Sequence, residues 1–145
     1  VDTKIHNMMI ATSAQGRMLA ISFNCTDDHA DEWLKVDREI IKSAIRMQDT
    51  AYRYAGDEFT IILPETELEK ATAVAERVRH AVEIETRVLT DHRPLSVTVS
   101  IGVVEYLACE DTESFVHRAD SAMYVSKKKG RNKISFAPAL TQPVK

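Results

Sequence analysis

The sequence is poor in cysteine, in aromatic side chains and in long apolar runs, and each shortage excludes a class of protein. Its 145 residues include two cysteines, Cys25 and Cys109, whose spacing matches no disulfide or zinc pattern, so we expect reduced thiols in a cytoplasmic protein. No apolar run is long enough to cross a bilayer and no secretory leader is visible, so we expect no membrane contact by this chain itself. The net charge of −3 gives no basic surface for long nucleic acids, although a local group of cations could hold a small phosphorylated ligand.

What the chain does contain is the composition of an ordinary globular domain. Apolar residues make up 44% and charged residues 28%, and 145 residues suffice for one domain with a core. We expect a single domain over residues 1–145, in which residues 1–16 are a weakly patterned N-terminal segment and residues 137–145 a loose tail. Because the sequence starts at Val1, we also expect it to be a fragment of a larger protein, with further domains attached.

The hydrophobic pattern alternates between strand and helix. Short apolar or alternating runs predict strands at residues 17–23, 52–54, 59–63, 95–106 and 133–136. Helices are predicted to begin at Asp31, Thr66 and Asp111. The second opens with a capping box, T-x-x-E from Thr66 to Glu69, and Gly130 is placed to end the third. The order strand, helix, hairpin, helix, strand, helix, strand predicts an α/β fold in which helices pack on a sheet.

Helical spacing also predicts which residues of the second and third helices face the core. These are Leu68, Ala71, Val74, Ala75, Val78 and Val82 in the second helix, and Phe115, Ala119, Ala122 and Met123 in the third.

The break between the second and third strands carries two adjacent carboxylates. The stretch Ala55-Gly56-Asp57-Glu58 separates two apolar runs, which is the pattern of a β-hairpin. Adjacent carboxylates at a tight turn suit a divalent metal such as Mg²⁺, which prefers oxygen ligands and keeps phosphate partners. Gly56 would let a ligand approach the backbone. Ordinary turn chemistry also explains Gly-Asp, so the hairpin alone leaves both interpretations open.

Two further features fit a nucleotide. Asp37 lies within the apolar stripe of the first predicted helix, where a carboxylate needs a partner, either the N–H groups of a guanine edge or a salt bridge. Residues 127–132, Lys-Lys-Lys-Gly-Arg-Asn, place cations at the end of the third helix, where they complement the helix dipole or clamp phosphates. Together with the hairpin carboxylates, these features favour nucleotide binding with phosphoryl or nucleotidyl transfer.

Longer motifs give the chain a resemblance to a known family. RYAGDEF (53–59) resembles the signature of GGDEF domains, the diguanylate cyclases. VTVSIGV (97–103) resembles a later strand of that family, and ADSAMYVSKKKGRN (119–132) resembles its A-D-x-A-L-Y-x-A-K-x-x-G-R-N segment. Residues 3–7 (TKIHN) resemble the family's opening motif L-T-G-L-x-N in part, so the resemblance extends from there to Phe136.

The resemblance implies a fold and a reaction. The fold would be a central mixed sheet flanked by helices, like the palm of nucleotide cyclases and polymerases, with the AGDEF signature on a β-hairpin. Active members of the family condense two GTP molecules, each held with Mg²⁺ by one subunit of a homodimer, into cyclic di-GMP and diphosphate. The chain would then belong to a bacterial signalling protein.

The resemblance also implies site residues. Asp57 and Glu58 would be the catalytic, metal-binding carboxylates. The residues that hold GTP would be Asp28, Asp37, Gly56, Lys127 and Arg131, with the two aspartates near guanine and the two cations on the triphosphate.

The first strand departs from the family pattern D-x-D-x-F-K-x-x-N-D, whose leading Asp is a metal ligand. An ungapped count back from Asp37 places that position at Ala20, and a two-residue deletion places it at Ser22. Neither side chain supplies the charge that a two-metal site uses to neutralise reacting phosphates. The guanine-binding Asn of the family falls at Asp28, which accepts hydrogen bonds but does not donate while ionised. We therefore expect cyclase activity to be absent or strongly reduced.

A second motif, Arg46-Met47-Gln48-Asp49, resembles the R-x-x-D inhibitory site of the family, where the product cyclic di-GMP binds away from the active site. Arg46 would stack on or hydrogen-bond a guanine, and Asp49 would accept guanine N–H groups. Arg77 resembles a further arginine of that site. The structural alternative is a solvated Arg46–Asp49 pair at a helix end.

Three functions remain open. In the first, a degenerate GGDEF module senses cyclic di-GMP through the R-x-x-D site and passes the signal to attached sensory or effector domains. In the second, the chain is a working diguanylate cyclase in which Asp27 or Asp28 replaces the missing carboxylate. In the third, it is a regulator that binds GTP near the hairpin without turnover.

Overall fold

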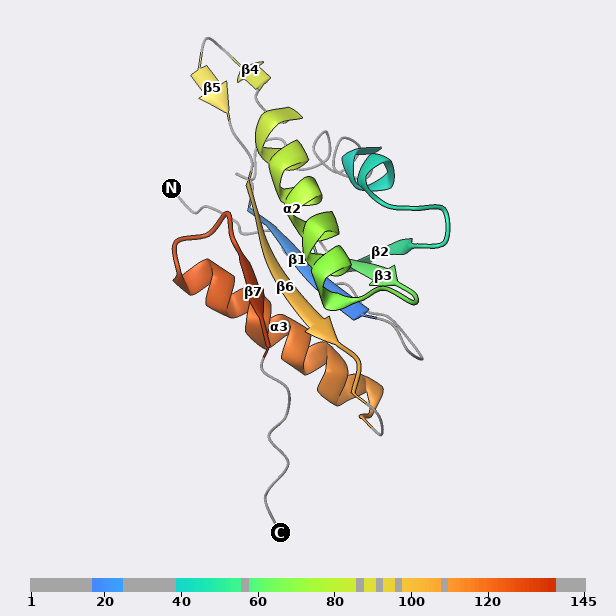
Figure 1. Ribbon diagram of the computed structural model, residues 1–145. Helices are drawn as coiled ribbons and strands as arrows, with labels where there is room; N and C mark the ends of the chain where they lie inside the picture. Colours follow the sequence, from blue (N-terminus) through green and yellow to red (C-terminus); the bar gives the residue numbers. More distant parts are fainter. Residues whose placement is uncertain are drawn as a thin grey trace.

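The computed structural model describes residues 17–24, 39–55, 58–85, 88–90, 93–95, 98–107 and 110–137. Two long helices, α2 (Leu68–Glu85) and α3 (Thr112–Lys128), pack on a five-stranded sheet, and residues 39–44 form a shorter helical segment (Figure 1). The sheet has the order β2-β3-β1-β6-β7, with the bounds β1 Arg17–Asn24, β2 Thr50–Ala55, β3 Glu58–Leu63, β6 Thr98–Glu105 and β7 Ile134–Phe136. The predicted α/β fold is confirmed.

The sheet is mixed, with β1 at its centre. β1 pairs antiparallel with both β3 and β6 over most of its length. β6 pairs in parallel with β7, and α3 makes the crossover between them, so β6, α3 and β7 form a βαβ unit. The central position of β1 brings the first strand of the chain next to the signature hairpin on one side and next to the VTVSIGV strand on the other.

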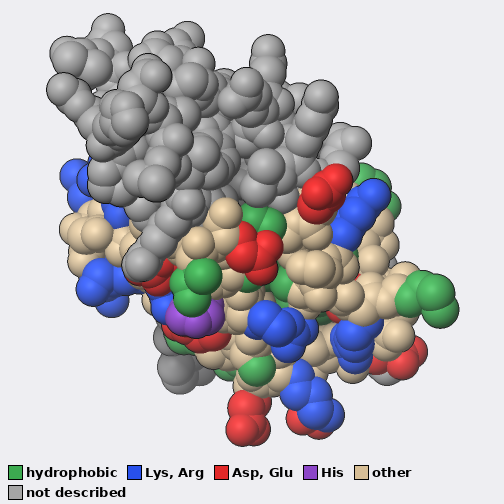
Figure 2. Space-filling view, turned by 90° about the horizontal axis from the view of Figure 1, so that it is seen from above, with side chains coloured by type: hydrophobic (Ala, Val, Ile, Leu, Met, Phe, Trp, Pro, Cys, Tyr) green, Lys and Arg blue, Asp and Glu red, His purple; other side chains and the backbone are tan. Residues whose placement is uncertain are grey.

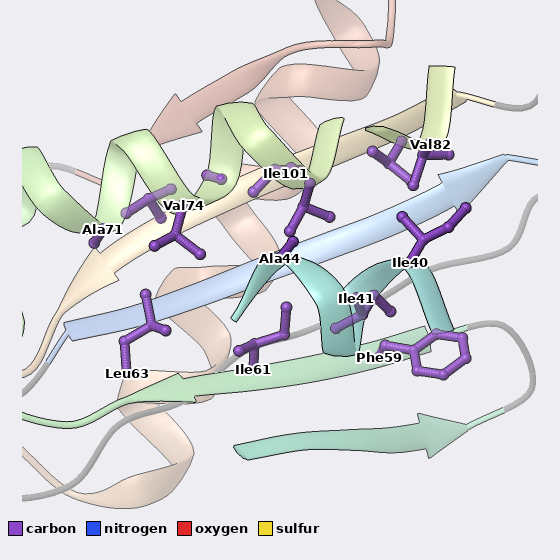
Figure 3. Close-up of a cluster of buried hydrophobic side chains, with 14 residues drawn as sticks. Ile40, Ile41, Ala44, Phe59, Ile61, Leu63, Ala71, Val74, Val82 and Ile101 are labelled. Atoms are coloured by element: carbon purple, nitrogen blue, oxygen red, sulfur yellow. The ribbon is translucent and has the colours of Figure 1, made fainter. Parts of the chain in front are cut away.

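The two faces of the sheet are covered by different helices. Residues of β6 alternate between them: Val99, Ile101 and Val103 belong to the cluster under α2, and Val104 belongs to the cluster under α3. Figure 3 shows the first cluster, in which side chains of residues 39–44, β3, α2 and β6 meet. Full burial of each large aliphatic side chain contributes roughly 1.5–3 kcal/mol relative to exposure, so this cluster is the main source of stability for the α2 face.

Helix α3 lies directly against β6 at Gly102. A Cβ atom built there would lie 2.5 Å from the backbone nitrogen of Met123 and closer still to the carbonyl oxygen of Ala119. On the same face the hydroxyl of Ser126 donates to the carbonyl of Ile101 at 2.8 Å. Only a residue without a side chain permits this approach of helix to strand.

Most predicted strands are confirmed, and one is divided differently. The strand predicted at 95–106 is β6, which begins at Thr98, whereas Leu95 belongs to a separate two-stranded sheet of β4 (Val88–Thr90) and β5 (Arg93–Leu95). That small sheet was not predicted, because its strands have three residues each and show no hydrophobic period.

The predicted faces of both long helices are confirmed except at Leu68, which is 39% exposed in the first turn of α2. Asp111 caps α3 as predicted: its carboxylate accepts the Ser114 N–H at 2.8 Å, and this bond holds the pKa of Asp111 below its usual value. Gly130 follows the end of α3 with φ 104°, the left-handed conformation that glycine favours.

Of the helix predicted from Asp31, the structure describes residues 39–44. Residues 1–16 and 138–145 lie outside the described residues.

The capping box predicted at Thr66 and Glu69 is wrong. Helix α2 begins at Leu68, and its first backbone bond runs from the Ala71 N–H to the carbonyl of Glu67 at 2.9 Å, so Glu67 is the N-cap residue. The hydroxyl of Thr66 instead donates to the carbonyl of Pro64 at 2.8 Å. The T-x-x-E spacing fits a cap in sequence, but the turn after β3 uses the hydroxyl for another contact.

Replacing Gly102 should weaken the whole domain. We expect Gly102→Ala to lower the free energy of unfolding by about 3 kcal/mol, because the new methyl group meets the backbone of α3, which cannot move aside as a side chain could. Urea denaturation followed by circular dichroism measures the change. Ser121→Ala, at an exposed position of α3, is the control and should stay within about 0.5 kcal/mol of wild type. An equally small effect of Gly102→Ala would contradict the close approach.

Candidate functional site

The AGDEF signature lies on a hairpin, as predicted. β2 and β3 pair as far as Ala55 and Glu58, so only residues 56 and 57 separate the strands. The register shifts between Arg53 and Ala55, which marks a β-bulge just before the turn. Gly56 and Asp57 themselves lie outside the described residues, and for Glu58 the structure describes the backbone.

The backbone register places β1 beside this signature. Ser22 pairs with Glu58 on β3 and with Ser100 on β6, and Ala20 pairs with Thr60 and Gly102. Both positions at which the resemblance predicts the metal-binding Asp therefore lie on the strand adjacent to the hairpin. Asp28 and Asp37, which would face guanine by analogy, lie outside the described residues. Within the ranges that the structure describes, no three His, Cys, Asp or Glu residues gather as a metal site.

The segment after α3 has an unusual backbone. Gly130, Arg131 and Asn132 have successive φ values of 104°, 59° and 47°. The Arg131 N–H donates to the carbonyl of Ser126 at 3.1 Å, while its guanidinium is exposed and has no hydrogen bond or ion pair to any described residue. Left-handed conformations cost about 1–2 kcal/mol for a residue with a Cβ, so neighbouring contacts must hold this turn.

A polar network from α2 supplies those contacts. Arg79 Nη1 donates to Asn132 Oδ1 at 2.9 Å and to Glu83 at 3.0 Å, and Asn132 Nδ2 donates to the other oxygen of Glu83 at 3.0 Å. Partial burial alone would lower the pKa of Arg79, but hydrogen bonds to Glu76 and Glu83 outweigh it and raise the pKa above its usual value. The i,i+3 and i,i+4 spacing of these α2 residues was a signal available in the sequence, whereas their contact with Asn132 was not.

Arg46 and Asp49 form a tight pair at the turn that follows residues 39–44. Nε and Nη2 of Arg46 donate to the two carboxylate oxygens of Asp49 at 3.2 and 3.0 Å, and the backbone N–H of Arg46 donates to the same carboxylate at 2.7 Å. The Asp49 side chain is 0% exposed, and that of Arg46 is 42% exposed. The Arg46–Asp49 pair of the structural alternative is present, but it is not solvated as that alternative supposed, because the Asp49 carboxylate is buried and Arg46 covers it.

Arg77 reaches the same turn from α2. Its Nε donates at 2.9 Å to the carbonyl of Ala44, the last residue of the helical segment, and its Nη2 donates to the same oxygen. Carbonyls at a helix C-terminus lack partners within the helix and attract cations. The three residues predicted for the R-x-x-D site are thus brought together around residues 44–49.

One member of this cluster was missed by sequence reasoning. The Nη2 of Arg46 also donates to the hydroxyl of Thr66, which is 3% exposed. Arg46, Asp49, Arg77 and Thr66 together are named the arginine cluster below. Thr66 precedes α2 and Arg77 lies in its middle, whereas the network around Asn132 is bound by Arg79 and Glu83 of the second half of the helix.

The surface charge of the domain is mixed. Figure 2 shows basic and acidic side chains interspersed over one face of the described residues, without a large area of one sign. Among the helices that the structure describes, none is long and apolar enough to cross a membrane.

Comparison with known proteins points to one family. The model of "Diguanylate cyclase, GGDEF domain" matches residues 25–133. Over 119 residues the chain is 44% identical to Diguanylate cyclase A of Treponema denticola, a match that covers 80% of this chain and 32% of that protein. It is 38% identical over 109 residues to the response regulator PleD of Caulobacter vibrioides, covering 74% of this chain and 24% of that protein. The chain therefore spans about a third or less of the length of these relatives.

Solved structures that are similar to this chain point to the same family. Diguanylate cyclase SiaD of Pseudomonas aeruginosa, in complex with its activator SiaC, is similar with a TM-score of 0.72 and 34% identity, covering 85% of this chain and 50% of that one. The GGDEF domain of DgcB from Caulobacter crescentus, in complex with cyclic di-GMP, gives a TM-score of 0.70 and 25% identity, covering 86% of this chain and 79% of that one. These similarities confirm the predicted palm-like fold.

The network around Asn132 makes a stability prediction. Asn132→Gly keeps the left-handed backbone accessible but removes both side-chain hydrogen bonds, so we expect a loss of about 1–2 kcal/mol. Asn132→Ala removes the same bonds and adds the left-handed penalty, and should be less stable than Asn132→Gly by about 1 kcal/mol. Urea denaturation of both variants measures the difference. A more stable alanine variant would contradict the positive φ at this position.

Proposed function

Since this chain belongs to the GGDEF family, we propose that it is a cyclic di-GMP signalling domain that binds the dinucleotide at the arginine cluster and has little or no cyclase activity of its own. The observation that carries the proposal is the exposed guanidinium of Arg46, fixed on one side by a buried carboxylate and open on the other. The DgcB structure, which contains cyclic di-GMP, supports it by similarity.

The chemistry of the cluster suits this ligand. Of the five N–H donors of Arg46, three are used by Asp49 and Thr66, which leaves the two on Nη1 without a partner among the described residues. Guanine presents N7 and O6 as acceptors, either of which can accept a hydrogen bond from Nη1, and the guanidinium plane can also stack on the base. Arg77 adds a second exposed cation beside the same turn, which matches the two phosphodiester charges of the ligand.

In the conformation observed, Asp49 contributes to ligand binding indirectly, by holding the guanidinium of Arg46. Its carboxylate accepts three hydrogen bonds from Arg46 and is shielded from solvent. Guanine N–H groups can reach it only after the guanidinium of Arg46 moves away, whereas contact with Nη1 needs no rearrangement. The direct contact between Asp49 and guanine stays a prediction.

The donor set near the hairpin supports impaired catalysis. Members of the family are metal-dependent, and a Mg²⁺ ion is commonly held by one or two carboxylates together with substrate phosphates. Asp57 and Glu58 fit one such ion, brought in with a nucleotide. A two-metal arrangement would need a further carboxylate from β1, where Ala20 and Ser22 stand at the positions paired with Thr60 and Glu58. The residues present therefore fit GTP binding better than turnover.

Active cyclase is the second candidate. The 44% identity to a protein named Diguanylate cyclase A favours it. In that case Lys127 and Arg131 would hold the triphosphate, two subunits would pair, and a carboxylate from the segment after β1 would have to replace the missing one. Both candidates place the domain in the cytoplasm as part of a larger signalling protein.

Arg46 should be required for ligand binding. We expect Arg46→Ala to weaken cyclic di-GMP binding by roughly 10- to 100-fold, since a charge-assisted hydrogen bond contributes about 1.5–3 kcal/mol. Isothermal titration calorimetry of the nucleotide-stripped protein measures the affinity. Lys42→Ala is the matched control, because Lys42 is an exposed cation four residues earlier, in the helical segment that precedes the turn, and it should bind as wild type does. Equal affinity of Arg46→Ala and wild type would refute the site.

Turnover separates the two candidates. With GTP and Mg²⁺ at high protein concentration, we expect no cyclic di-GMP when the products are separated by ion exchange, because the first-strand carboxylate is missing. Ala20→Asp and Ser22→Asp test whether a carboxylate at either position gives product. Product from the wild type that disappears in Asp57→Ala would establish the cyclase and overturn the expectation drawn from β1.

A further inference from the structure

Thr66 has a role that its sequence pattern conceals. The T-x-x-E spacing predicts an N-cap, yet Glu67 is the N-cap residue and the Thr66 side chain turns to the arginine cluster. The residue is 3% exposed, so its hydroxyl must find partners within the protein. Those partners are the carbonyl of Pro64 and the guanidinium of Arg46.

The Thr66 hydroxyl is the donor in one of these hydrogen bonds and the acceptor in the other. A hydroxyl group has one hydrogen and two acceptor lone pairs. The hydrogen of Thr66 goes to the carbonyl of Pro64 at 2.8 Å, and this bond turns the lone pairs of the oxygen to Arg46. The Thr66 hydroxyl therefore already accepts a hydrogen bond from Arg46 when no ligand is bound.

The contact decides how the Arg46 guanidinium is held. Asp49 binds Nε and Nη2 along one edge, and Thr66 takes the second hydrogen of Nη2. An arginine held by a carboxylate alone still has freedom along its long side chain, and binding a ligand would have to order it. With Thr66 as a second support, twenty residues further along the chain, the turn at 46–49 is tied to the connection between β3 and α2.

We propose that Thr66 is a positioning residue of the cyclic di-GMP site, holding Arg46 so that its Nη1 edge and its plane face the ligand. The proposal rests on the proposed function of the arginine cluster and extends it to a residue outside the R-x-x-D motif. Because the effect passes through Arg46, a hydroxyl at position 66 matters for affinity although Thr66 does not touch the ligand.

Three variants test the proposal by calorimetry with cyclic di-GMP. Thr66→Val keeps the shape and removes the hydroxyl, and we expect about 10-fold weaker binding. Thr66→Ser restores the hydroxyl and should bind within about twofold of wild type, since it offers the same donor and acceptor. Thr72→Val is the matched control, because the Thr72 hydroxyl donates to the carbonyl of Leu68 on α2, whereas the hydrogen bonds of the Arg46 side chain go to Asp49 and Thr66. It should bind as wild type does.

A measurement without ligand separates this proposal from the proposed function. The Nε–Hε signal of Arg46 in a ¹⁵N NMR spectrum, assigned by its loss in Arg46→Ala, reports how firmly the guanidinium is held on Asp49. We expect its hydrogen to exchange with water several-fold faster in Thr66→Val than in wild type, Thr66→Ser or Thr72→Val.

The outcomes are distinct. Weak binding and fast exchange in Thr66→Val alone support the positioning role. Equal or tighter binding by Thr66→Val, with a wild type that binds, overturns it, and so does weak binding that Thr66→Ser fails to rescue. If the wild type does not bind cyclic di-GMP, the proposed function fails, and unchanged Arg46 exchange in Thr66→Val would then overturn the positioning role as well.

Discussion

The contact between α3 and β6 at Gly102 is the constraint on which the rest of the domain depends. Because a Cβ atom at this position would meet helix backbone, α3 can lie close to the sheet only if residue 102 is glycine. The approach fixes the βαβ unit of β6, α3 and β7, and with it the left-handed turn at 130–132 that presents Arg131. It also leaves the opposite face of β6 to α2, whose apolar side chains close the main core.

Helix α2 then connects two polar regions that are remote in sequence. Arg77 binds the carbonyl of Ala44 at the arginine cluster, and Arg79 and Glu83 hold Asn132 after α3. In both places a charged α2 side chain satisfies backbone or side-chain groups at the end of another helix, where such groups lack partners. A rigid helix thus keeps the candidate ligand site and the exposed Arg131 in fixed relation to the same core.

The domain combines a candidate ligand site whose buried polar groups are paired with a strand β1 that carries no carboxylate. At the arginine cluster, every hydrogen-bonding group of Asp49 and Thr66 described above has a partner, and one edge of Arg46 remains open. Beside the signature hairpin, Ala20 and Ser22 of β1 pair with Thr60 and Glu58, and these are the two positions at which the resemblance predicts a metal-binding aspartate. This combination is what a signalling module needs if it responds to cyclic di-GMP rather than making it, which is the function proposed above.

The sequence by itself determined the order of the elements that build the main sheet and its helices, the hairpin and, except at Leu68, the buried faces of α2 and α3, because hydrophobic period and turn residues act locally. The small sheet of β4 and β5 was not predicted. The sequence also determined the family, since contiguous motifs carry the resemblance, whereas the R-x-x-D site stays a prediction. Only the tertiary structure decided that the Thr66 hydroxyl binds Arg46 instead of capping α2, that Arg46 covers Asp49, and that α2 holds Asn132. These contacts join residues about 20 or 50 positions apart, or depend on side-chain geometry, and no local pattern distinguishes a threonine that caps a helix from one that supports an arginine.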